Sequence, residues 1–87
     1  MTITKIYIHK PTKDNYFNKN LLADVDIVID YDIVINGIKL MKGNKGKYLK
    51  FPYDYKGRNI AFPINNEIRQ YILEKILQAY SEEDINE

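Results

Sequence analysis

Apolar and polar residues alternate along much of the first part of the chain, a pattern that predicts β-strands. In one such segment Val25 and Ile27 share a face, while Asp24 and Asp26 share the other. Gly, Asn, Asp and Pro separate the segments and favour turns. The predicted strands are Thr2–His9, Leu22–Ile29, Ile33–Met41 and Tyr48–Phe51, with a loop over Lys10–Asn20 and turns at Asp30–Asp32 and Gly43–Gly46.

The third predicted strand is apolar at both odd and even positions. Ile33 and Ile35 alternate with Val34, and Ile38 and Leu40 follow. A strand with apolar residues on both faces is typically covered on both faces. We therefore expect the C-terminal helix, a second subunit, or both to cover it.

Apolar residues then recur every four positions, at Ile68, Ile72 and Ile76, which predicts an amphipathic helix over Asn66–Tyr80. Asn65 is a favourable N-cap for this helix, and Pro63 discourages helix just before it. Strands followed by one helix indicate an α+β fold. We expect an antiparallel meander sheet of about four to five strands, packed by the C-terminal helix.

The chain has 87 residues, enough for a single domain over 1–87, with an acidic tail at 81–87 that could be disordered. It contains no cysteine, which suits a reducing compartment and excludes thiol chemistry. No apolar run approaches the roughly 18 residues of a membrane span. We expect a cytoplasmic protein that does not bind membranes.

Charged residues are unevenly distributed although the net charge is only +1. Four acids lie between Asp24 and Asp32, and acids also follow Tyr80. Between Lys39 and Arg58 every charged residue is basic except Asp54. A nearly neutral total thus contains one basic block, which favours an anionic partner.

Other candidate sites have simpler structural explanations. The acidic residues near Asp24 lack the pattern of a calcium loop, and no residue nearby in sequence would complete a triad or a metal site with His9. The segment Gly43–Lys47 lacks the spacing of a phosphate-binding loop and fits a hairpin turn. We therefore predict no enzyme activity, no cofactor, no metal and no small-molecule substrate.

Residues 47–58 interleave bases with aromatic residues, a composition that suits nucleic acid. Lys and Arg can neutralise phosphates, and Tyr rings can stack on bases. From the residues alone, a solvated loop is an equally good explanation. The predicted nucleic-acid-binding residues are Lys42, Lys45, Lys47, Lys50, Tyr53, Tyr55, Lys56, Arg58 and Arg69.

The chain also resembles the SpoVG family of bacterial sporulation and septation regulators from about Ala23 to Tyr80. The resemblance rests on the paired strands, the turn Gly43–Gly46, the Phe-Pro at 51–52, and the stretch Gly57–Asn65 followed by Arg69. That stretch is similar to the family's G-x-F-R-D-I-x-H-P-I-N. Arg58 and Arg69 match by position, whereas Lys50 and Lys56 are assigned from charge.

The resemblance implies a homodimer formed partly by strand pairing, DNA and RNA binding, and a regulatory role in development, division or virulence genes. The chain departs from the family after Pro52, where Tyr53, Asp54 and Tyr55 replace a basic group. Tyr is enriched in protein interfaces. Two hypotheses follow: a dimeric nucleic-acid-binding regulator, or a protein-interaction module that keeps the scaffold without binding nucleic acid.

Overall fold

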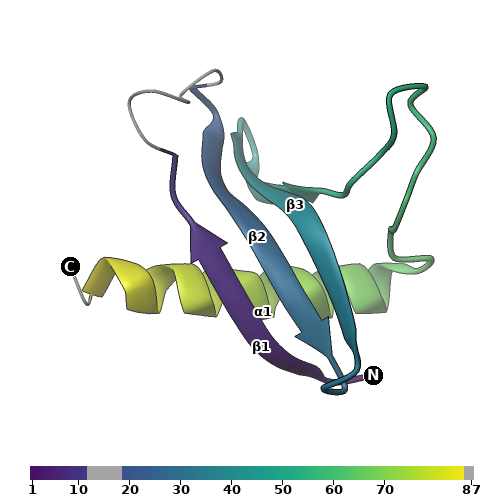
Figure 1. Ribbon diagram of the computed structural model, residues 1–87. Helices are drawn as coiled ribbons and strands as arrows, with labels where there is room; N and C mark the ends of the chain where they lie inside the picture. Colours follow the sequence, from purple (N-terminus) through teal and green to yellow (C-terminus); the bar gives the residue numbers. More distant parts are fainter. Residues whose placement is uncertain (12–18, 86–87) are drawn as a thin grey trace.

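The computed structural model describes residues 1–11 and 19–85, so the middle of the predicted loop Lys10–Asn20 lies outside the described residues. Four strands form one antiparallel meander sheet in the order β1-β2-β3-β4, and α1 follows (Figure 1). The α+β prediction is confirmed. The elements are β1 Ile3–His9, β2 Leu21–Ile29, β3 Ile33–Gly43, β4 Gly46–Lys50 and α1 Asn66–Ile85.

The helix covers one face of the sheet, as its apolar spacing predicted (Figure 1). Ile72 and Ile76 are buried against Val25, Ile27 and other strand residues in one cluster. Burial of each such side chain contributes about 1.5–3 kcal/mol. The face of the sheet turned away from α1 is called the open face below.

The helix begins as predicted and ends later than predicted. The Ile68 N–H donates to Asn65 Oδ1 at 2.8 Å, which confirms Asn65 as the N-cap. The helix continues past Tyr80 to Ile85, so the predicted end is wrong. Residues 81–85 contain neither Gly nor Pro, and nothing local stops the helix there. Residues 86–87 of the acidic tail lie outside the described residues.

A β-bulge in β3 explains why that strand is apolar at both parities. Val25 pairs with Ile38 but Ile27 pairs with Ile35, so β3 carries an extra residue between these pairs. Gly37 has a φ of +79°, a conformation that favours glycine. Ile35 and Ile38 therefore both lie opposite buried residues of β2. Val34, on the other face, is 56% exposed in the single chain, so the expectation that a second subunit covers that face stays a prediction.

The open face carries several charged residues, and their charges are partly paired. Lys39 Nζ lies 2.7 Å from Asp24 Oδ1, and His9 Nε2 lies 3.1 Å from Asp26 Oδ2. Both pairs are partly exposed to solvent, and such pairs contribute at most about 1 kcal/mol each. Asp24 and Asp26 therefore each pair with a side chain of a neighbouring strand, which agrees with a structural role for these two acids.

Candidate nucleic-acid interface

All nine residues predicted to bind nucleic acid are solvent-exposed. They fall into three groups along the chain. The hairpin group comprises Lys42, Lys45 and Lys47; the arm group comprises Lys50, Tyr53, Tyr55, Lys56 and Arg58; and Arg69 lies on α1.

The hairpin group occupies the turn between β3 and β4. Gly43 pairs with Gly46 across this turn, and Lys42 pairs with Lys47. Two like charges directly opposite each other destabilise a sheet slightly, and an anion between them would remove that repulsion. Gly46 takes a φ of +123°, which agrees with the predicted turn. The hairpin therefore displays three amines at one end of the sheet.

Lys50 is the last residue of β4, and the rest of the arm group belongs to a small projecting hairpin, residues 52–60, called the arm (Figure 1, teal to green). The Ile60 N–H donates to the Pro52 carbonyl at 3.0 Å, and the Asp54 N–H donates to the Arg58 carbonyl at 2.8 Å. The Gly57 N–H donates to the Asp54 carbonyl at 2.9 Å, and Gly57 takes a φ of +80°. This turn is ordered by its own hydrogen bonds, although the sequence suggested only a loop.

The Asp54 carboxylate holds the arm's turn together. It accepts the backbone N–H groups of Lys56 and Arg58, each at 2.9 Å, and Arg58 Nε at 2.8 Å. The Arg58 N–H is the main cause of the lowered pKa of Asp54, with further lowering by the Arg58 guanidinium and the Lys56 N–H; desolvation opposes them. Arg58 is therefore partly neutralised within its own turn.

The tyrosines of the arm point outward. Tyr53 is 52% exposed and Tyr55 is 91% exposed. Lys50 Nζ lies 5.6 Å from the centroid of the Tyr53 ring, and Lys56 Nζ lies 5.7 Å from that of Tyr55. Each tyrosine ring thus has a cation beside it, as cation–π contacts require.

Arg69 lies at the base of the arm. Its guanidinium carbon is 5.6 Å from the centroid of the Phe51 ring, and Phe51 is buried in the core next to Pro52. Arg69 and Lys50 therefore flank the point at which the arm leaves the sheet.

Tyr48 and Lys19 also lie near these groups and were not among the predicted residues. Tyr48 is exposed and pairs with Met41, so it shares the open face of β4 with Lys50. Alternation within the strand could have placed it there. Lys19 lines a polar hollow beside the hairpin, and its position depends on a long-range approach that no local pattern encodes. That hollow is lined by Lys19, Asn20, Lys42, Gly43, Asn44 and Tyr48.

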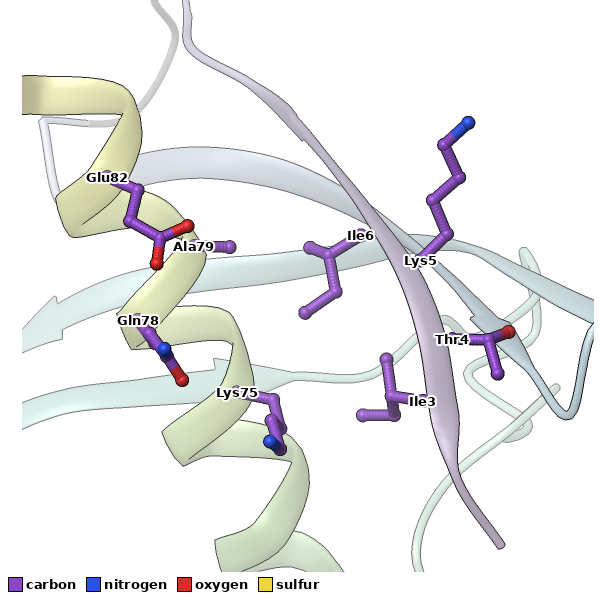
Figure 2. A pocket seen from close by; sticks show the side chains of 8 residues that line it. All are labelled: Ile3, Thr4, Lys5, Ile6, Lys75, Gln78, Ala79 and Glu82. Carbon is purple, nitrogen blue, oxygen red and sulfur yellow. The ribbon is translucent and has the colours of Figure 1, made fainter. Parts of the chain in front are cut away.

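A second hollow, of about 290 Å³, lies between β1 and α1. Figure 2 shows Ile3, Ile6 and Ala79 on its apolar side and Glu82 at its edge. Its polar lining residues are Thr4, Lys5, Lys75, Gln78 and Glu82. Among residues 1–11 and 19–85, no three potential ligands gather to hold a metal ion, and no helix has the length and apolar character to cross a membrane.

Comparison with known proteins decides the family. A model of the SpoVG family matches residues 1–82. The chain belongs to the SpoVG family. The resemblance seen over Ala23–Tyr80 is confirmed and extends to include β1.

Relatives named as septation proteins, SpoVG, match along nearly their whole length. The protein of Agathobacter rectalis is 37% identical over 87 residues, covering 95% of each chain. That of Clostridioides difficile is 34% identical, covering 94% of this chain and 89% of its own. That of Staphylococcus saprophyticus is 31% identical, covering 97% and 83%. These SpoVG relatives carry names of septation proteins and not of enzymes.

Proposed function

We propose that this SpoVG-family chain is a non-catalytic, dimeric nucleic-acid-binding regulator. The observation that carries the proposal is the exposure of all nine basic and aromatic residues of the hairpin group, the arm group and Arg69. Amines bind phosphates without regard to sequence, and exposed aromatic rings bind bases. Amines and exposed aromatic rings occur together on β4 and on the segments before and after it.

An apolar strip before α1 supports the dimer. Ile60, Phe62 and Ile64 are 67%, 51% and 87% exposed, respectively. They occupy alternate positions of one short segment, and contiguous exposed apolar surface marks protein interfaces. The outer edges of β1 and β4 also have no strand partner in the part of the chain that the structure describes. The strip and either edge could be covered together by a second copy of this chain.

The salt dependence of binding tests the electrostatic part of the proposal. About three phosphate contacts per subunit would give a slope of log affinity against log salt near −5 for a dimer on duplex DNA. Fluorescence anisotropy with labelled oligonucleotides between about 50 and 200 mM salt measures this slope. Absence of binding to every oligonucleotide at the lowest salt would refute the proposal.

A matched pair of variants locates the contacts. Changing Lys45→Gln and Lys47→Gln together should make the slope shallower by about one per lysine in each subunit. The control changes Lys5→Gln and Lys75→Gln, which lie at the β1–α1 hollow. It removes the same charge and should leave the slope nearly unchanged. If the two variants changed the slope equally, binding would depend on the net charge of the protein and not on the hairpin lysines.

A protein-interaction module is the second candidate function, favoured by the apolar strip and by the Tyr-Asp-Tyr sequence of the arm. A pull-down from nuclease-treated lysate, with and without Ile64→Lys, separates the two. Specific partners that survive nuclease and are lost with Ile64→Lys would favour this second function. Partners lost on nuclease treatment would favour nucleic acid.

A further inference from the structure

We infer that the arm binds single-stranded nucleic acid in preference to duplex, with Tyr55 and Tyr53 as stacking platforms. This inference rests on the proposed function and specifies its ligand. The observations that carry it are the exposure of the two rings and the partners of the surrounding charges.

The rings are presented where an unpaired base could reach them. Tyr55 lies in the arm's turn with nearly its whole surface exposed, and Tyr53 lies in the adjoining β-bridge with Asn59. Unpaired bases offer free faces to such rings, whereas the bases of a duplex are already stacked on one another. A duplex could therefore use these tyrosines only at the expense of its own stacking.

The arm's cations suit a single strand better than a duplex. Arg58 is held by Asp54 at 2.8 Å, so part of its charge is already compensated. Lys50 Nζ and Lys56 Nζ lie over one face of the Tyr53 and Tyr55 rings, at 5.6 and 5.7 Å from the centroids, so a base would stack on the opposite face. A base stacked on either ring would bring its phosphate near the adjacent amine. Charge and stacking then act on the same nucleotide.

The binding surface continues onto the sheet. Tyr48 and Lys50 share the open face of β4, and Lys50 reaches over Tyr53. Three exposed tyrosines and two lysines thus follow one another from β4 into the arm, in the order Tyr48, Lys50, Tyr53, Tyr55 and Lys56. Sequence-tolerant single-strand binding combines stacking rings with basic groups in this way.

The test compares an oligothymidine of about 12 nucleotides with a duplex of matching length at one salt concentration, by fluorescence anisotropy. The wild-type chain should bind the single strand about tenfold tighter or more. Tyr55→Ala should weaken single-strand binding about 5- to 100-fold and change duplex binding less than about twofold. Tyr55→Phe keeps the ring and should retain nearly full affinity.

Tyr31→Ala is the matched control, because Tyr31 is also exposed but lies at the other end of β3 from the β3–β4 hairpin. It should bind both oligonucleotides as the wild type does. Duplex binding as tight as single-strand binding, or Tyr55→Ala acting equally on both or on neither, would overturn the inference while leaving the proposed function in place. Binding to neither oligonucleotide would overturn both. Far-UV circular dichroism confirms that each variant is folded.

Discussion

Replacing Gly37 with alanine tests whether the left-handed backbone at the β3 bulge requires glycine. Gly37 has a φ of +79°, in the left-handed region. Its Cβ would meet only the Pro52 Cβ, at 4.0 Å, which is ordinary contact. The cost is therefore the backbone preference alone, about 1–2 kcal/mol. Because Gly37→Ala also restricts the unfolded chain, we expect a net loss near 1 kcal/mol.

Urea unfolding followed by circular dichroism, at one protein concentration, measures this loss. The melting temperature should fall by about 4–8 °C per kcal/mol for a domain of this size. Gly37→Asn should recover part of the loss, since asparagine tolerates positive φ. The reasoning would be refuted if Gly37→Ala were as stable as the wild type, or if Gly37→Asn were no better than Gly37→Ala.

Gly57→Ala provides a comparison at nearly the same backbone angle. Its φ is +80°, and no atom lies within 4 Å of the added Cβ. The intrinsic cost is thus similar, but Gly57 lies in the exposed arm and Gly37 lies within the sheet. Local opening of the arm can relieve the strain without unfolding the core. We expect Gly57→Ala to lower global stability less than Gly37→Ala does.

Three further predictions concern the core, the arm and the subunit interface. Ile76→Ala should lower the free energy of unfolding by about 2–5 kcal/mol, measured by urea denaturation, because Ile76 is fully buried beneath the sheet. The lowered pKa of Asp54 means that its carboxylate stabilises the arm above the unfolded pKa of about 3.9, and that this contribution is lost as pH falls through the folded value. Amide chemical shifts of Lys56 and Arg58 should therefore change below about pH 4, and Asp54→Asn should show that change weakened. Ile64→Lys should shift a dimer toward monomer in light scattering, whereas Tyr31→Lys should not; equal behaviour would place the interface elsewhere.

The sequence predicted the fold well wherever local periodicity and long-range packing agree. The two faces of β2 and the apolar side of α1 follow from the spacing of Val25, Ile27, Ile72 and Ile76. The pattern of apolar residues in β3 did not reveal the bulge, because two-sided burial and a bulge produce similar patterns. An isolated glycine within a strand, here Gly37, was the available signal for a bulge.

The candidate site was only partly predictable. Exposure of the predicted residues follows from their polarity and from the short loops that carry them. The hydrogen-bonded turn of the arm also had a signal in the sequence, because Asp54 and Gly57 have the spacing of a type I turn followed by a glycine. The approach of Arg69 to Phe51 joins α1 to the end of the sheet, and only the folded chain brings these residues together.

Mapping amide chemical shifts of the ¹⁵N-labelled chain during titration with an oligothymidine tests the central claim most directly. The proposed function predicts shifts concentrated in Lys42–Lys50 and in the arm, with β1 and the second half of α1 nearly unchanged. Shifts confined to the β1–α1 hollow, or none at oligonucleotide concentrations that saturate other single-strand-binding proteins, would contradict it.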